Sequence, residues 1–157
     1  MSGFRRGVRL GIDVGRARVG VARCDPDGML AVPVETVPRN EQSIDRIAAL
    51  TAEYEPLELV VGLPVNMQGA DTASTTDARE FAAALGARTG TPVRLVDERL
   101  STVTAHAALR SSGRTQKNSR SIVDQVAAVV LLQQAIDTEK STGNPPGATV
   151  PLDEESP

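Results

Sequence analysis

Three carboxylates stand where an apolar segment of the chain meets a turn or a helix end. Asp13 follows one apolar run, Glu98 follows a later one, and Asp124 opens a long apolar helical pattern. Carboxylates gathered at one place repel one another unless hard cations such as Mg²⁺ or Mn²⁺ neutralise them. Two such ions about 4 Å apart activate a water and stabilise the leaving oxygen of a phosphodiester. If the three acids converge, the chain has the side chains for metal-dependent hydrolysis.

Each of the three acids also has an ordinary structural interpretation. Asp13 stands between two glycines and could instead cap a tight hairpin turn. Glu98 has an acid before it and a base after it, so it could form a surface ion pair or cap the next helix. Asp124 could complement the dipole of its own helix. Spacing alone leaves these interpretations open.

The elements that must position these acids follow from the hydrophobic periodicity. Apolar runs at 8–13, 18–24 and 29–36 are separated by short turns, which predicts an antiparallel meander of three strands. After Pro56, strand and helix patterns alternate, as is typical of a sheet covered on both faces. Further strands are expected at 57–64 and 92–97, and helices at 43–53, 74–89, 101–111 and 121–138.

Length, charge and cysteine content narrow the class of protein. The 157 residues suit one domain, and the single cysteine, Cys24, excludes an internal disulfide. Since no apolar run has membrane-spanning length and no signal peptide is evident, we expect a soluble cytoplasmic protein with no membrane partner. The segment 139–157 carries the whole net charge of −3, so the rest is neutral and can bind nucleic acid. Its Pro, Gly and acid content predicts a disordered tail.

Four separated motifs stand out along the chain. They are Gly11-Ile12-Asp13-Val14-Gly15, Val61-Gly62-Leu63-Pro64 with Gly69, Asp97-Glu98-Arg99-Leu100-Ser101-Thr102 and Val123-Asp124-Gln125-Val126-Ala127-Ala128. With these motifs in this order, residues 8–138 closely resemble the YqgF/RuvX family, which is similar to ribonuclease H-like nucleases and RuvC-type resolvases. The resemblance implies an α/β fold, with a ribonuclease H-like three-layer α/β/α domain at 1–138. Its sheet would be five-stranded and mixed, with the first three strands antiparallel.

The same resemblance implies an activity and a site. Members of the family are described as Holliday junction resolvases and as nucleases that mature the ends of precursor ribosomal RNA. A two-metal endonuclease using Mg²⁺ or Mn²⁺ is therefore implied, with Asp13, Glu98 and Asp124 as catalytic metal ligands. The resemblance selects Glu98 over Asp97, a choice that strand alternation alone does not make. RuvC-type resolvases carry a further acid one helical turn before the last ligand, where this chain has Ser121.

Polar and basic side chains around the acids are candidates for binding nucleic acid, although each could belong to an ordinary solvated face. Three aromatic residues are too few for base stacking to dominate, so recognition is expected to rest on shape and backbone charge. The basic segment 112–119 is expected to be a mobile loop. A resolvase cuts two strands symmetrically and would be a homodimer, whereas RNA end maturation carries no such requirement. The candidates are Arg16, Arg18, Asn66, Gln68, Arg99, Arg114, Lys117 and Arg120.

Two other functions remain open at this point. The fold and its acids could serve a non-catalytic nucleic-acid-binding or ribosome-assembly factor. The segment Asp13-Val14-Gly15 could also be the phosphate loop of an actin-like or sugar-kinase ATPase. Those ATPase folds need two domains around the nucleotide, and this chain has room for one.

Overall fold

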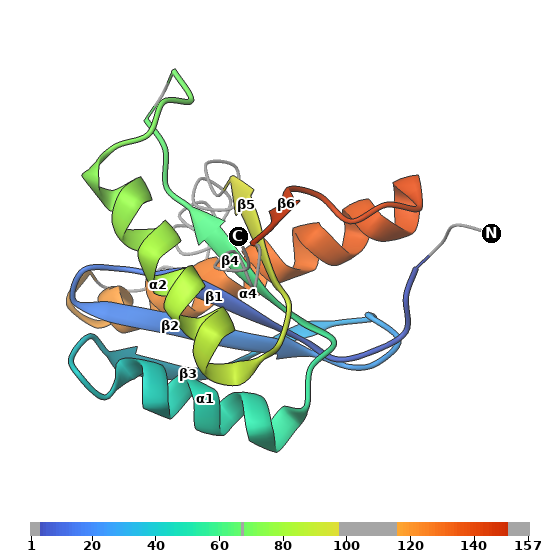
Figure 1. The fold of residues 1–157 in the computed structure, drawn as a ribbon, viewed down its shortest axis with the longest axis horizontal. Helices are drawn as coiled ribbons and strands as arrows, with labels where there is room; N and C mark the ends of the chain where they lie inside the picture. Colours follow the sequence, from blue (N-terminus) through green and yellow to red (C-terminus); the bar gives the residue numbers. More distant parts are fainter. Residues whose placement is uncertain (1–3, 67, 98–115, 151–157) are drawn as a thin grey trace, which may run out of the picture.

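Six strands form one mixed sheet, and helices cover both of its faces (Figure 1). The computed structural model describes residues 4–66, 68–97 and 116–150, and of 116–124 only the backbone. The strands are β1 (Arg9–Val14), β2 (Arg18–Cys24), β3 (Ala31–Pro38), β4 (Glu58–Leu63), β5 (Val93–Asp97) and β6 (Ala148–Thr149). The described helices are α1 (Ser43–Tyr54), α2 (Ala73–Thr89) and α4 (Gln116–Thr142).

The order of the strands is β3-β2-β1-β4-β5-β6. The first three strands pair antiparallel, and β4 and β5 add in parallel with β1. This confirms the mixed sheet with an antiparallel beginning. β3 is an edge strand with a register shift in its pairing, an arrangement that tolerates Pro33. The described residues form six strands rather than the expected five, because β6 pairs antiparallel with β5.

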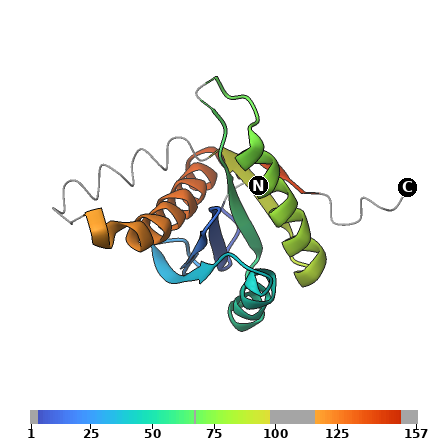
Figure 2. The same cartoon turned by 90° about the vertical axis from the view of Figure 1, so that its left-hand side faces the viewer.

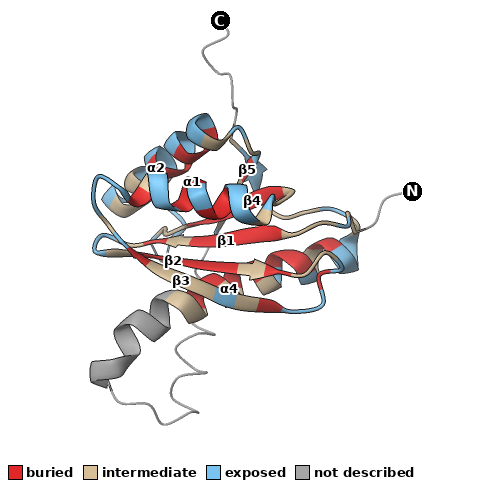
Figure 3. Ribbon diagram, turned by 90° about the horizontal axis from the view of Figure 1, so that it is seen from below, coloured by how far each residue is buried: buried red, intermediate tan, exposed pale blue. Residues whose placement is uncertain are grey.

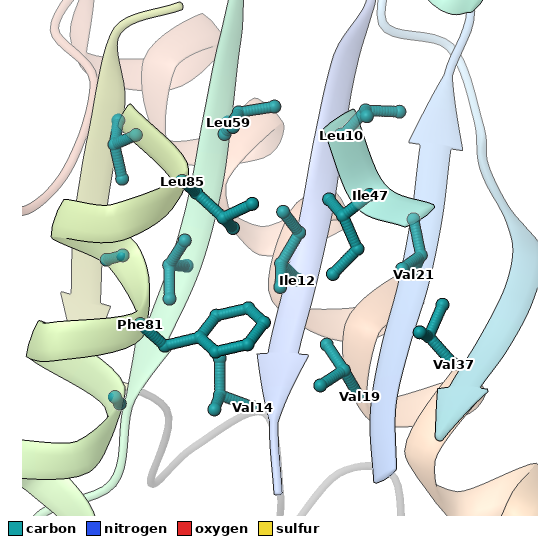
Figure 4. Packing of buried hydrophobic residues seen from close by; sticks show 14 of the residues in the cluster. Leu10, Ile12, Val14, Val19, Val21, Val37, Ile47, Leu59, Phe81 and Leu85 are labelled. Carbon is teal, nitrogen blue, oxygen red and sulfur yellow. The ribbon is translucent and has the colours of Figure 1, made fainter. Parts of the chain in front are cut away.

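The three layers are visible when the sheet is viewed edge-on, with α4 on one face and α1 and α2 on the other (Figure 2). Alternation along β1 divides its side chains between two cores. Leu10, Ile12 and Val14 point toward α1 and α2, where they pack with Phe81 and its neighbours (Figure 4). The intervening positions face α4, and most of β1 is therefore buried on both sides (Figure 3).

α4 lies close against β1 because Gly11 has no side chain. A Cβ atom at Gly11 would stand 2.8 Å from the Leu132 Cβ atom and 2.9 Å from the Ala128 carbonyl oxygen. Ala22 and Val60 pair with Gly11 from the two neighbouring strands, and both are buried against the same helix. Gly11 thus sets the distance between the helix and the sheet.

Gly11→Ala is expected to lower the free energy of unfolding by about 1 to 3 kcal/mol, the usual range for forcing extra volume into a packed core. The new methyl group meets a backbone oxygen and the base of a side chain, neither of which can rotate away. Urea denaturation of the variant and the wild type measures the loss. Gly90 is unsuitable for a control substitution by alanine, because its φ of 71° is left-handed. Ala83→Gly, on the exposed side of α2, is the control and shows the effect on stability of a one-carbon change outside the core. Unchanged stability in Gly11→Ala would contradict this close approach.

The sequence prediction is wrong at both ends of α4. The helix begins at Gln116, within the segment 112–119 that was expected to be a loop, and it continues to Thr142. β6 then pairs with β5, and the Val150 amide donates to the Val93 carbonyl at 2.8 Å. The predicted disorder of 139–157 therefore does not hold for residues 139–150, because backbone pairing and buried charge order them. Residues 151–157 and the helix predicted at 101–111 lie outside the described residues.

A buried ion network ties the end of α4 to the start of β1. The side chains of Arg9 and Glu139 are 2% and 3% exposed, and Arg9 Nη2 lies 3.2 Å from Glu139 Oε1. Arg5 donates to Glu139 through its backbone amide and through Nε, at 2.9 and 2.8 Å. Glu58 accepts from Arg5 and Arg94, which extends the network to the start of β4 and to β5.

The pKa of Glu139 predicts how stability changes in acid. Burial opposes its charged form, but hydrogen bonds from Arg5 and the charges of Arg9 and Arg5 outweigh burial and lower the pKa from 4.5 to about 2. Because the folded state holds the lower pKa, this contribution is complete above about pH 4.5 and is lost as pH falls toward 2. The loss is up to about 3 kcal/mol, at 1.4 kcal/mol per pKa unit. Urea midpoints at pH 6 and pH 3 measure it, and Glu139→Gln should lose this part of the pH dependence. An equal pH dependence in both proteins would contradict the assignment.

None of the helices in the described part of the chain combines the length and hydropathy that crossing a membrane requires.

Cys24 is fully buried at the end of β2, where burial raises the pKa of its thiol. It therefore acts as a small apolar residue of the α4-side core.

Candidate active site

Asp13 occupies the α4 face of the sheet near the end of β1. Asp13 is two residues after Gly11 in the strand, so the two residues share one face of the sheet, and Gly11 contacts α4 on that face. Its partner across the antiparallel pair with β2 is Gly20, which has no side chain. Asp13 is half-buried, whereas Leu10, Gly11 and Ile12 before it are buried. The carboxylate therefore stands where the sheet opens toward solvent, opposite a residue of β2 that has no side chain.

The backbone of α4 brings Asp124 toward the same end of β1. The helix runs antiparallel to β1, since Glu139 lies beside Arg9 at the strand's start and Ala128 lies over Gly11. Asp124 is one helical turn before Ala128, so its backbone lies on the Asp13 side of that contact. Its side chain lies outside the described residues, as do those of Lys117 and Arg120.

β5 ends at the same edge of the sheet as β1, because the two strands are parallel to β4. Val96 packs with the core beneath α4, whereas Leu95 belongs to the core on the α2 side. Alternation therefore places Asp97 on the α2 side, opposite the face of Asp13. Glu98, Arg99 and Arg114 lie outside the described residues.

The loop after β4 is shaped by Asn66, which was a candidate for binding nucleic acid. Its Oδ1 atom accepts hydrogen bonds from the Gln68 and Ala70 amides, both at 2.9 Å. The hydroxyl of Thr75, in the first turn of α2, donates to the Pro64 carbonyl and closes the loop against the helix. Asn66 thus orders the loop, and Gln68 is exposed on it.

Arg16 lies in the turn between β1 and β2 and is exposed, whereas Arg18 begins β2 and is half-buried. Arg16 lines an open hollow of about 390 Å³ with Arg39 and Asp77. Hydrogen bonds from Arg39 lower the pKa of Asp77, so this carboxyl group is ionised at neutral pH. Sequence reasoning missed Arg39 and Asp77, because the two residues are 38 positions apart and no local motif links them.

The carboxylate oxygens of the predicted site suit a hard divalent cation. Among the residues whose side chains are described, no group of three or more histidine, cysteine, aspartate or glutamate side chains gathers. Two of the three predicted ligands belong to the remainder of the chain, so their convergence with Asp13 stays a prediction. What the structure places is the half-buried Asp13 carboxylate and the helix that carries Asp124.

The layer order and the antiparallel beginning of the mixed sheet define a ribonuclease H-like α/β/α protein, with an acid at the end of its first strand. The chain belongs to the family described as "RuvX: Holliday junction resolvase", whose sequence model matches residues 7–138.

Proteins of known sequence and structure agree with this assignment. The chain is 54% identical over 151 residues to a "Putative pre-16S rRNA nuclease" of Clavibacter michiganensis, covering 94% of each chain. It is 52% identical to the protein of the same name from Streptomyces coelicolor, covering 94% of this chain and 90% of the other. The structure of Thermus thermophilus RuvC in complex with a Holliday junction substrate aligns with a TM-score of 0.55 at 17% identity. That alignment covers 91% of this chain and 99% of RuvC, and it shows a shared fold.

Proposed function

We propose that this protein is a metal-dependent endonuclease that hydrolyses phosphodiester bonds in structured nucleic acid. The observation that carries the proposal is the half-buried Asp13 carboxylate, on the face of the sheet covered by the helix of Asp124. The family membership and the names of the relatives support it. We place its action in the cytoplasm, where both candidate substrates would be found.

Asp13, Glu98 and Asp124 would hold Mg²⁺ or Mn²⁺ in this proposal. Bound divalent cations would supply an activated water and charge stabilisation for the leaving oxygen. The chain's own part is to keep these carboxylates ionised and together at one edge of the sheet. The position of Asp97 on the α2 side supports Glu98 as the acid that β5 contributes.

Two substrates are supported by different relatives. The curated relatives are named as pre-16S rRNA nucleases, and RuvC was solved with a Holliday junction. We favour precursor ribosomal RNA because those relatives are about 50% identical, whereas RuvC supports only the fold. Arg16, Arg18, Asn66, Gln68, Arg99, Arg114, Lys117 and Arg120 remain proposed contacts to the nucleic acid.

The direct test compares cleavage of a labelled precursor 16S RNA end and a labelled four-way DNA junction, each with Mg²⁺, Mn²⁺ or EDTA. Metal-dependent cutting of the RNA alone is the expected result. Cutting of the junction alone would replace RNA by DNA as the substrate. Tight binding without cutting of either would favour the second candidate, a nucleic-acid-binding or ribosome-assembly factor on the same fold.

Junction cleavage would require a homodimer, because two strands must be cut symmetrically. Sedimentation with and without the junction tests this requirement. A monomer in both conditions would count against the resolvase activity and would leave RNA processing intact.

A further inference from the structure

The hollow beside the β1–β2 turn is built around one arginine that joins three parts of the chain. Arg39 follows β3, and its backbone amide donates to the Ala17 carbonyl at 2.9 Å. Its Nη1 atom donates to the Gly15 carbonyl at 2.9 Å, and its two Nη atoms donate to the Asp77 carboxylate at 2.9 and 2.7 Å. The guanidinium also lies 4.7 Å from the centre of the Phe81 ring. Arg39 is therefore fixed from several sides, and it fixes the turn that carries Arg16.

These contacts do not engage all the hydrogen-bond donors of the Arg39 guanidinium. A guanidinium has five N–H donors, and three of the donors of Arg39 are engaged by Gly15 and Asp77. Within the described residues, its Nε–H and one Nη2–H bond have no partner. The Arg39 side chain is 22% exposed and lines the hollow, so part of it is open to a ligand there. A planar arginine held in place is well suited to binding a phosphate.

The charges of the hollow favour an anion. Asp77 offsets one of the two arginines, which leaves one positive charge on the exposed Arg16. The volume of about 390 Å³ lies within the usual range for small-ligand sites. Arg16 is three residues after Asp13, so the two Cα atoms are at most about 10 Å apart. The hollow itself lies on the α2 side of the sheet, since Asp77 belongs to α2 and Arg39 lies over the Phe81 ring. An anion in the hollow would therefore lie near the β1–β2 turn, on the other face of the sheet from Asp13.

We propose that the hollow lined by Arg16, Arg39 and Asp77 binds one backbone phosphate of the nucleic-acid substrate where the strand passes the β1–β2 turn. Arg16 contacts the phosphate, and Arg39 holds the turn and offers its remaining donors to the same phosphate. Asp77 keeps Arg39 in place and limits the positive charge. The inference rests on the proposed nuclease function for its ligand, but it concerns binding and can be tested without cleavage.

The test measures the affinity of the cleavage-deficient Asp13→Asn protein for a labelled precursor RNA end in EDTA, over a series of salt concentrations. Arg16→Gln in this background is expected to weaken binding at low salt and to reduce the slope of log affinity against log salt by about 1, the value for one lost phosphate contact. Arg88→Gln is the matched control, because Arg88 is an exposed arginine near the other end of α2. Equal slopes for the two variants would overturn the proposal.

A second variant separates positioning from charge. Arg39→Lys keeps the charge but loses the planar fork, so it should also weaken binding. If both arginines serve one phosphate, Arg39→Lys should cost little further affinity once Arg16 is replaced. Fully additive losses would contradict a shared phosphate. Arg16→Gln could instead weaken the binding of inorganic phosphate and leave the salt dependence of RNA binding unchanged. That result would assign the hollow to a free anion and overturn the proposal.

Failure of this inference differs from failure of the proposed function. If the protein cuts RNA but Arg16→Gln does not change the salt dependence of binding, only the proposed phosphate subsite is wrong. If the protein cuts nothing but Arg16→Gln does reduce the salt dependence, the proposed nuclease function is wrong and the phosphate subsite stands.

Discussion

Asp13→Asn is expected to reduce metal-dependent cleavage by about 1,000-fold or more. The substitution keeps the shape of the side chain and removes the charge that would hold a divalent cation. Metal-ion stabilisation of a phosphodiester transition state is worth several kcal/mol, and about 4 kcal/mol corresponds to 1,000-fold in rate. Because Asp13 is half-buried at a strand end and faces Gly20 across the pair, Asn should fit without disturbing the sheet. Single-turnover cleavage of the precursor RNA end measures the effect.

Two controls make this experiment specific. Asp27→Asn makes the same chemical change at an exposed residue whose partner is the exposed Arg6, in the turn between β2 and β3. It should leave the rate within about twofold of the wild type. Asp97→Asn tests the choice between the two acids at the end of β5, and it should retain far more activity than Glu98→Gln. Full activity in Asp13→Asn, or equal losses in Asp97→Asn and Glu98→Gln, would contradict the proposed ligand set.

Glu139→Gln is expected to lower the free energy of unfolding by about 3 to 5 kcal/mol at neutral pH, the usual cost of breaking a buried ion pair from one side. Glu139 forms an ion pair with Arg9, whose side chain is 2% exposed. Water therefore cannot reach the Arg9 guanidinium to compensate for the lost carboxylate charge. Arg9 keeps hydrogen bonds to the Gly7 and Arg5 carbonyls, which leave its positive charge without a buried counterion. Urea denaturation followed by circular dichroism measures the loss.

Glu80→Gln is the matched control, since Glu80 is exposed on α2, and its effect should be within about 0.5 kcal/mol. A cost for Glu139→Gln as small as that of the control would show that the network contributes little. The network lies at the start of β1, and Asp13 lies at the other end of the strand. Cleavage by the folded fraction of Glu139→Gln should therefore stay close to the wild-type rate.

The sequence determined the elements and their layers. Apolar runs and the turns between them placed five of the six strands and the three described helices, because burial of side chains at strand and helix periods is a local property. Pro33 stands in β3, and proline is typical of an edge strand with irregular pairing such as β3. The motif around Asp13 placed that acid at the end of β1, where the structure has it.

Tertiary structure decided everything that depends on partners far along the chain. Arg9 and Glu139 are 130 residues apart, so composition alone could not show that Glu139 is buried and that α4 continues past it. The face on which Asp97 lies, at the end of β5, also needed the sheet, because the packing of Val96 against the α4 core assigned Asp97 to the other face. The hollow of Arg16, Arg39 and Asp77 likewise joins a turn, a strand end and a helix that no local pattern connects. Local periodicity shows where a strand or a helix runs, whereas the neighbours of each charge are known only once those elements have packed.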